Sequence, residues 1–346
     1  MSLLYPSKPV PGDRVAILSM GVGLPQILPL PFELGLRRLR DDFGLIPVEY
    51  PTTRRMNATP ADRAADLHAA FADDTVTAVI ATIGGDDQIT VLPHLDADLL
   101  RANPKPFFGY SDNTNLLAHL SSLGIVGFHG GSVMVELGRP TSMNPITERS
   151  LRAALFETTR FRLTEPTAFG DENRDWADPV TFETEPAMRP AAGWTWRNPV
   201  RRVEGHSWGG CLEIVAGLAM ADLAFPEPEY FDGAVLFLET SEEMPDAQDV
   251  YRWLRGLGLR GVLGRCGALL MARPKAWSLD NRTDEAARQA YVTAQRAAVN
   301  RALDEYAPDL VAVFDVDFGH TDPQQVIPYG GTVVVDGPAR TITVHY

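Results

Sequence analysis

The stretch VTAVIATIGG at residues 76–85 decides the fold class, because it reads as a buried strand that ends at two glycines. A strand without polar alternation is typical of a parallel sheet covered on both faces. Residues 14–19 and 45–50 form similar runs on the N-terminal side, and the segments between the three runs have helical spacing. Strands that alternate with helices predict an α/β domain, with its ligand at the carboxyl ends of the strands.

The second half of the chain restarts this pattern. Residues 233–239, GAVLFLE, form a buried strand that ends in a carboxylate, and residues 310–314, LVAVF, form another. Helical patterns cover residues 246–257 and 284–306. Two short apolar runs within residues 333–344, separated by Asp-Gly-Pro, predict a terminal hairpin.

Residues 164–207 lack clear periodicity and mix proline, glutamate, tryptophan and arginine. A connection this long is usually a functional loop or an interdomain crossover, although packed hairpin strands are the alternative. We therefore expect an N-terminal domain over residues 1–163, a crossover and substrate segment over 164–207, and a smaller C-terminal α/β domain over 208–346.

Composition and charge restrict the function classes. Hydrophobic residues make up 45% of the 346 residues and charged residues 22%, which is ordinary for a soluble enzyme. The net charge of −14 disfavours binding to nucleic acid or to anionic membranes. The two cysteines form no disulfide framework, and neither a signal peptide nor a run of roughly 20 apolar residues is present. These features indicate a cytoplasmic protein.

Ser111 lies where the apolar run 106–108 and Gly109 give way to a helix-like stretch. A serine at such a strand-to-helix corner presents its hydroxyl outward beside backbone N–H groups, as in a nucleophile elbow. The pattern is Gly-x-Ser-x-Asn rather than Gly-x-Ser-x-Gly. The alternative is a serine that caps a helix.

Glu239 directly follows an apolar strand, where an unpaired carboxylate is costly, and a histidine N–H is a natural partner for it. A capping or ion-paired glutamate is the alternative, and Glu242 reads as solvated. Of the seven histidines, His320 is best placed, because it follows a buried strand and a glycine. His129, which ends a strand near the serine, is the competing base.

These residues predict a triad of Ser111, Glu239 and His320. His320 would remove the proton of Ser111, and Glu239 would orient and stabilise the imidazole. The backbone N–H groups expected to bind the oxyanion are those of Gly85, Asp86 and Asp112.

Other chemistries are less well supported. The chain contains no Gly-x-Gly-x-x-Gly motif, phosphate loop, His-x-x-x-His or Cys-x-x-Cys pattern, so we expect neither a cofactor nor a metal. Cys211 is flanked by apolar residues and lacks an obvious base, which disfavours it as a nucleophile.

These motifs resemble the landmarks of the LD-carboxypeptidase family, serine carboxypeptidases with a Ser-Glu-His triad. The resemblance extends from about residue 10 to residue 344 and rests on Ile83–Asp87, Phe108–Thr114, Leu238–Glu239 and Phe318–Thr321. It implies a Rossmann-like, parallel-sheet N-terminal domain that carries the serine and a C-terminal α/β domain that carries the glutamate and histidine. It also implies a homodimer and metal-free removal of a C-terminal residue from a small peptide-like substrate.

Two branches of the family differ in substrate. Muramoyl-tetrapeptide carboxypeptidases release D-alanine from peptidoglycan fragments, whereas microcin C self-immunity carboxypeptidases cleave the amide between aspartate and a modified nucleotide. The immunity branch holds the base with aromatic residues of a long loop, and Trp176 and Phe182 are similar to that pair. We therefore favour a microcin-immunity-like enzyme, although Cys211 stands where the family commonly has asparagine.

Two rival functions remain open from the sequence. One is an esterase or amidase that uses the same triad on a substrate without a free carboxylate. The other is a non-catalytic α/β protein whose serine and histidine only line a pocket for a small ligand.

Overall fold

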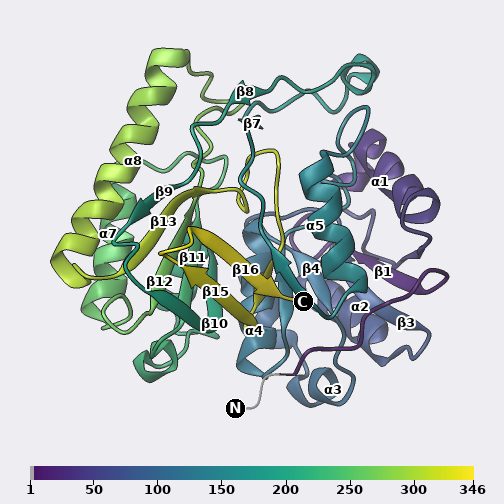
Figure 1. Ribbon diagram of the computed structural model, residues 1–346. Coiled ribbons are helices and arrows are strands. Elements are labelled where there is room, and N and C mark those ends of the chain that lie inside the picture. Colours follow the sequence, from purple (N-terminus) through teal and green to yellow (C-terminus); the bar gives the residue numbers. More distant parts are fainter. Residues whose placement is uncertain (1–3) are drawn as a thin grey trace.

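A computed structural model describes residues 4–346 and shows two α/β halves, each built around its own sheet (Figure 1). In the first sheet, five parallel strands follow the order β2-β1-β3-β4-β5, which is the flavodoxin-like order. A sixth strand is antiparallel to β5 at the edge. The strands are β1 (Arg14–Leu18), β2 (Ile46–Glu49), β3 (Val76–Ala81), β4 (Phe107–Gly109), β5 (Gly127–His129) and β14 (Ile327–Tyr329).

Five helices accompany this sheet: α1 (Pro29–Asp41), α2 (Pro60–Ala72), α3 (Ala97–Ala102), α4 (Thr114–Ser122) and α5 (Pro145–Phe156). Helix α2 begins with Pro60 at its first position, and the Thr59 side chain caps it by accepting the N–H of Asp62. Every residue of β3 except Thr77 is buried, because helices cover both faces of the sheet.

The second sheet has eight strands in the order β6-β16-β15-β10-β11-β12-β13-β9. The central four, β10 to β13, are parallel, and the others are antiparallel to their neighbours. The strands are β6 (Arg160–Arg162), β9 (Thr195–Arg197), β10 (Arg202–Cys211), β11 (Val235–Glu239), β12 (Ala268–Ala272), β13 (Val311–Val316), β15 (Thr332–Asp336) and β16 (Thr341–His345). Helices α6 (Leu212–Ala221), α7 (Ala247–Leu259) and α8 (Glu285–Tyr306) belong to this half. The two-domain α/β class and the terminal hairpin β15–β16 are as predicted.

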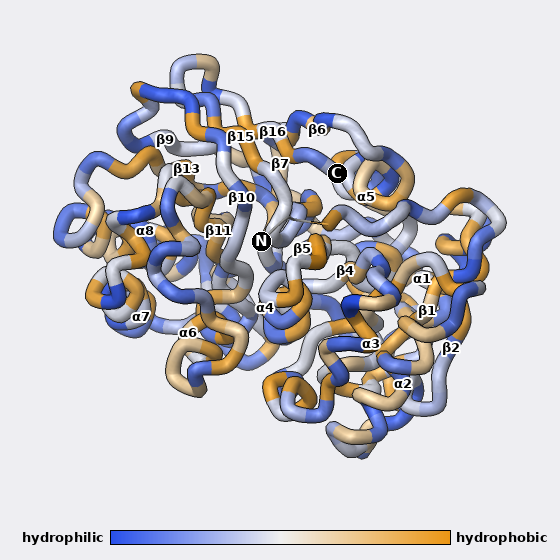
Figure 2. The backbone as a smooth tube through the Cα atoms, turned by 90° about the horizontal axis from the view of Figure 1, so that it is seen from below, coloured by the Kyte–Doolittle hydropathy of each residue, from blue (hydrophilic) through white to orange (hydrophobic). Residues whose placement is uncertain are grey.

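Each half contributes one short strand to the sheet of the other half. The two sheets therefore do not coincide with the residue ranges that the sequence suggested for the domains. Strand β6 lies before residue 164 but pairs in the second sheet, and β14 lies after residue 208 but closes the first sheet. Strand β10 starts at Arg202, inside the segment expected to be a crossover. In Figure 2 the strands β5 and β10 and helix α4 lie together where the two halves meet.

Residues 168–190, the bridging segment, pass between the two halves at the top of Figure 1. The segment contains the two-residue strands β7 (Ala168–Phe169) and β8 (Arg189–Pro190), which pair with each other, and the short helix η4 (Pro179–Glu183). Arg189 and Arg288 bind Glu172 at the α8 side of the bridging segment. At the other side, Glu185 binds Arg139. The sequence offers no periodicity here because most of the segment is irregular.

Within residues 4–346, no helix is long and apolar enough to cross a membrane. In the same part of the chain, no three His, Cys, Asp or Glu side chains are grouped so as to hold a metal ion.

Candidate active site

Ser111 occupies a strained corner between β4 and α4. Its φ angle is 61°, in the left-handed region that non-glycine residues rarely adopt. A serine with this backbone geometry between a strand and a helix is the hallmark of a nucleophile elbow. Helix α4 has Asn113 as its N-cap residue, and neither α4 nor the preceding 3-10 turn is capped by a side chain. The helix-capping alternative for Ser111 is therefore wrong.

Asn113 explains why the elbow motif ends in asparagine rather than glycine. Its Nδ2 donates hydrogen bonds to the carbonyl oxygens of Ile83 and Tyr110, both at 3.0 Å. Its Oδ1 accepts a hydrogen bond from Nε2 of Gln88 at 2.9 Å. A Cβ on Gly109 would lie 2.9 Å from Asn113 Cγ, so glycine is needed beside this side chain. These bonds tie the serine corner to the end of β3.

The turn at Gly84 and Gly85 packs directly against the serine. A Cβ at Gly84 would lie 2.9 Å from both Cβ and Oγ of Ser111 and 3.4 Å from the backbone nitrogen of Asp112. Gly85 has a φ of 152°, in the region that favours glycine. The structure thus brings the Gly84-Gly85 turn, where the first oxyanion donors are expected, next to Ser111 and the Asp112 N–H.

The side chain of Asp112 supports this corner, a role that the sequence did not reveal. Oδ2 accepts the backbone N–H of Gln88 at 3.0 Å, and Oδ1 accepts Nδ2 of Asn115 at 2.8 Å. Burial, together with nearby Asp87 and Asp86, raises the pKa of Asp112 to about 7.

Glu239 and His320 form the pair that the sequence predicts. Glu239 is the last residue of β11, and His320 follows β13, so both lie at the carboxyl edge of the second sheet. His320 Nδ1 donates to Oε2 of Glu239 at 2.6 Å; the Glu239 side chain is fully buried and that of His320 is 9% exposed. A Cβ on Gly319 would lie 3.0 Å from Glu239 Cβ, so the glycine before the histidine permits this approach.

The second ring nitrogen of His320 faces another carboxylate. Nε2 lies 3.2 Å from Oε2 of Glu242, whose side chain is half exposed. Burial disfavours the imidazolium, but the negative charges of Glu239, Glu242 and Glu213 outweigh it and raise the pKa of His320 to about 9. Glu242 is exposed, as the sequence indicates, but the sequence did not reveal its contact with His320.

Tyr110 connects the serine corner to this pair. Its ring stands edge-on to the His320 ring, with centroids 5.0 Å apart. Among residues 4–346, no hydrogen bond joins Ser111 to His320, because Glu239 and Glu242 face the two ring nitrogens. Catalytic hydrogen bonds are often incomplete before substrate binds, so the three residues remain a compatible set.

His129, the competing base, lies outside the site. It is completely buried, with its ring packed edge-on against Tyr110, Phe237 and Phe318. Burial lowers the pKa of His129 to about 3, so it is neutral. A side chain without solvent access cannot act on a substrate in a cavity.

Cys211 is also unsuited to be a nucleophile. It is buried, its Sγ donates to Oε2 of Glu213, and burial raises its pKa well above that of an ordinary thiol. The backbone N–H of Cys211 donates to Thr114 Oγ1 at 3.1 Å. A Cβ on Gly210 would lie 2.6 Å from the same oxygen, so a glycine is needed there. The Gly-Gly-Cys segment therefore joins β10 to the start of α4, which carries the serine corner.

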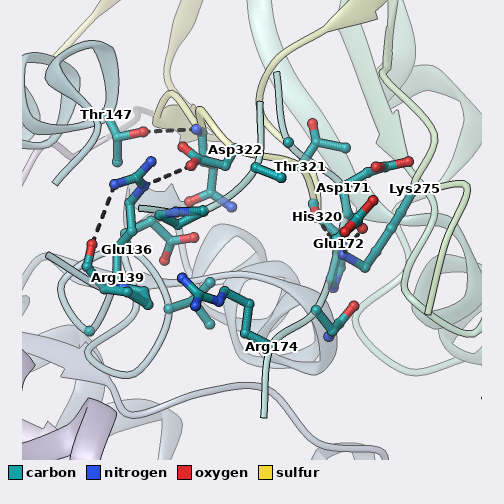
Figure 3. Close-up of a pocket in the computed structure, with 18 of the residues that line it drawn as sticks. Glu136, Arg139, Thr147, Asp171, Glu172, Arg174, Lys275, His320, Thr321 and Asp322 are labelled. Carbon is teal, nitrogen blue, oxygen red and sulfur yellow. Dashed lines mark hydrogen bonds and ion pairs between the residues drawn. The ribbon is translucent and has the colours of Figure 1, made fainter. Parts of the chain in front are cut away.

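A cavity opens beside His320, between the two halves and under the bridging segment (Figure 3). Trp176 lines this cavity together with Tyr110 and His320. Phe182 does not line it, because η4 carries Phe182 into a separate pocket against Leu30 and Leu34 of α1. The structure thus separates the two aromatic residues that the sequence paired.

The cavity also contains charged residues that the sequence analysis missed. Figure 3 shows them on both sides of His320: Glu136, Arg139, Asp171, Glu172, Arg174, Lys275 and Asp322. They come from four separate stretches of the chain, and no local motif marks them. Only the fold brings them together.

A family model matches each half of the chain. Residues 15–130 match the LD-carboxypeptidase N-terminal domain, and residues 204–335 match the LD-carboxypeptidase C-terminal domain. The chain therefore belongs to the LD-carboxypeptidase family, as the sequence motifs predicted, and this family is one of peptidases.

Two curated relatives represent both branches of the family. The microcin C7 self-immunity protein MccF of Escherichia coli is 24% identical over 291 residues, covering 83% of this chain and 79% of the relative. A protein named probable murein peptide carboxypeptidase in Bacillus subtilis is 26% identical over 293 residues, covering 82% and 76%.

Solved structures share the whole fold. MccF in complex with aspartyl sulfamoyl adenosine has a TM-score of 0.84 at 23% identity, covering 99% of this chain and 98% of that one. An MccF-like protein from Streptococcus pneumoniae in complex with AMP has a TM-score of 0.83 at 25% identity, covering 96% and 99%.

Proposed function

We propose that this protein is a serine carboxypeptidase that hydrolyses the C-terminal amide of a small peptide-like substrate through a covalent acyl-enzyme. The observation that carries the proposal is the hydrogen bond of 2.6 Å between Glu239 and His320. His320 lines the cavity. Tyr110, which directly precedes the strained Ser111, lines the same cavity. An acid, a base and a hydroxyl at such a corner are the parts that acyl transfer requires.

In this mechanism, Ser111 Oγ attacks the scissile carbonyl while His320 Nε2 takes its proton. Glu239 holds the ring through Nδ1 and stabilises the imidazolium. The N–H groups of Asp112 and of the Gly85-Asp86 turn would bind the oxyanion. His320 then protonates the leaving nitrogen, the C–N bond breaks, and a water molecule hydrolyses the acyl-enzyme with His320 again as base.

The substrate that we favour is an aminoacyl nucleotide in which an amide joins aspartate to a modified nucleotide. Two observations support it: MccF has been crystallised with aspartyl sulfamoyl adenosine, and Trp176 offers an aromatic face inside the cavity of this chain. The alternative is a muramoyl tetrapeptide that loses D-alanine. It is favoured by the position of Phe182 outside the cavity, which leaves the expected aromatic pair incomplete.

Several further parts of the proposal follow from the family. We propose a cytoplasmic homodimer that acts without a metal ion, so EDTA should leave the rate unchanged and light scattering should give twice the chain mass. The rival reading is a protein that binds a small ligand without turnover. A serine-directed phosphonate separates the two, since only the enzyme would be modified at Ser111.

The test is hydrolysis of two substrates side by side, a muramoyl tetrapeptide and aspartyl sulfamoyl adenosine, followed by mass spectrometry. Ser111→Ala is the blank. Release of aspartate supports the immunity-like enzyme, and release of D-alanine assigns it to peptidoglycan recycling. If Ser111→Ala retains near-full activity on either substrate, the serine mechanism is wrong.

A further inference from the structure

Lys275 lines the cavity with His320 but has no role in the triad. It lies three residues after the end of β12, which pairs in parallel with β11 on one side and β13 on the other. Lys275 therefore joins Glu239 and His320 at the carboxyl edge of the parallel strands, where ligands of α/β proteins bind.

The ammonium group of Lys275 is buried without a carboxylate partner. The residue is 6% exposed, and Nζ donates to the carbonyl oxygens of Asp171 at 2.8 Å and of His320 at 3.4 Å. An ammonium has three N–H donors, so one remains. Among residues 4–346, no carboxylate oxygen lies within 4.0 Å of Nζ, although a buried charge normally requires a counter-charge. A cation in this situation beside a catalytic histidine indicates an anionic ligand.

The other cations of the cavity are less suited to that role. Arg139 already binds two carboxylates, Asp322 at 2.7 Å and Glu185 at 2.9 Å. Arg174 donates to the backbone and side-chain oxygens of Thr184 within the bridging segment, and it is only partly buried. Arg174 is therefore the competing candidate, with less need of a counter-ion.

A purely structural role for Lys275 has a counterpart in the same chain. The protein has three lysines, Lys8, Lys105 and Lys275, among 31 basic residues. Lys105 is also buried and also donates to two backbone carbonyls, those of Asp73 and Val76. What distinguishes Lys275 is its place in the wall of the cavity, and Lys105 provides a matched control.

We propose that Lys275 binds the anionic group that lies next to the scissile nitrogen, on the leaving-group side of the substrate. Nζ of Lys275 lies 3.4 Å from the backbone oxygen of His320, and both residues line the cavity. In the proposed mechanism His320 passes its proton to the leaving nitrogen, so an anion that Lys275 binds beside His320 would belong to the leaving group. In a peptide the anion is the terminal carboxylate, and in an aminoacyl nucleotide it is the acyl sulfamate or phosphoramidate.

This inference rests on the proposed carboxypeptidase function, and its test uses two substrate pairs. The first pair is the tetrapeptide L-Ala-γ-D-Glu-L-Lys-D-Ala and its C-terminal amide. The second pair is aspartyl sulfamoyl adenosine and the neutral amide of aspartate with 5′-amino-5′-deoxyadenosine. The readout is the ratio of kcat/KM values for the anionic and neutral members of whichever pair is cleaved.

We expect Lys275→Met to lower this ratio on the order of 10- to 100-fold, since a hydrogen bond to a charged group is lost. Lys105→Met should leave the ratio unchanged even if it lowers the melting temperature. Lys275→Gln, which keeps a donor for the two carbonyl oxygens, serves if the methionine variant does not fold.

Three outcomes overturn the inference. If Lys275→Met lowers kcat/KM equally for both members of a pair, Lys275 has a purely structural role. If the ratio falls in Arg174→Met but not in Lys275→Met, Arg174 binds the anion. Failure of the wild-type protein to cleave any of the four compounds would refute the proposed function itself, which the first two outcomes leave intact.

Discussion

His320 Nε2 lies 3.2 Å from Oε2 of Glu242, so the nitrogen that accepts the serine proton in the proposed mechanism faces a carboxylate in the free protein. Glu239 faces the opposite ring nitrogen at 2.6 Å. Together these carboxylates favour an imidazolium, whereas a general base must be neutral. The raised pKa of His320 favours the protonated ring near neutral pH, so the proposed mechanism needs substrate binding or a higher pH to make this histidine neutral.

The first prediction concerns the pH dependence of kcat/KM, which reports on the free enzyme. The pKa of His320 is raised to about 9, so the wild-type rate should increase with pH up to about 9, as the ring loses its proton. Glu242→Gln removes one of the charges that raise this pKa, so the midpoint of the profile should move to lower pH. A midpoint that stays in place in the variant would contradict the assignment of His320 as base.

Glu243→Gln is the control for this experiment. Glu243 is exposed and adjacent in sequence, and its carboxylate makes no ion pair with His320 within residues 4–346. The same change of net charge at this position should leave the midpoint close to that of the wild type.

The second prediction distinguishes the effect of Ser111 on stability, through its strained backbone, from its effect on activity, through its hydroxyl group. Ser111 has a φ of 61°, which costs a side chain on the order of 1–3 kcal/mol but costs glycine little. Both Ser111→Ala and Ser111→Gly should abolish turnover, but only Ser111→Gly relieves the strain. Thermal unfolding should show Ser111→Gly to be more stable than Ser111→Ala by about 1 kcal/mol. Equal stabilities would mean that the corner is not strained in solution.

The third prediction tests the close packing at the Gly84 turn. The added methyl of Gly84→Ala would lie 2.9 Å from Ser111 Oγ and must displace the nucleophile. Activity should fall at least 100-fold, since a displacement of about 1 Å has that effect on positioned groups. Circular dichroism should show an intact fold.

Gly217→Ala is the matched control, because a Cβ on this residue of α6 would have no heavy atom within 4 Å. Alanine is the better helix former, so this variant should keep its activity and gain up to about 1 kcal/mol of stability. If Gly84→Ala behaves like Gly217→Ala, the turn does not constrain the serine.

The parallel strands and the contact between Glu239 and His320 could be predicted because the signals for them are local. Long apolar runs mark β3, β11 and β13, and the polar residues that follow such runs gather at one edge of a parallel sheet. Glu239 and His320 each follow such a strand, which is why 81 residues of separation did not conceal their contact.

The exchanged strands and the cavity charges could not be predicted, because they depend on tertiary pairing. Strands β6 and β14 have three residues each, too few to show a period, and β6 is bounded by arginines. Glu242 follows Glu239 in a polar stretch that reads as solvated, and only the position of His320 makes it part of the site. Lys275 carries no motif at all.

The last prediction concerns Trp176 and Phe182, which the sequence pairs and the structure separates. If a nucleobase stacks on Trp176, Trp176→Ala removes an interaction worth about 1–3 kcal/mol per base. The KM for aspartyl sulfamoyl adenosine should then rise on the order of 10- to 100-fold, with kcat less affected. Phe182→Ala should change this KM little, because Phe182 lies against α1.

A muramoyl tetrapeptide serves as the control substrate, since it has no base to stack. Trp176→Ala should lower its cleavage far less than that of the nucleotide substrate. Equal effects of Trp176→Ala on both substrates would show that Trp176 only shapes the cavity. A large effect of Phe182→Ala on the nucleotide alone would show that the bridging segment rearranges on binding to bring Phe182 to the base, because in the free protein η4 holds Phe182 in a different pocket.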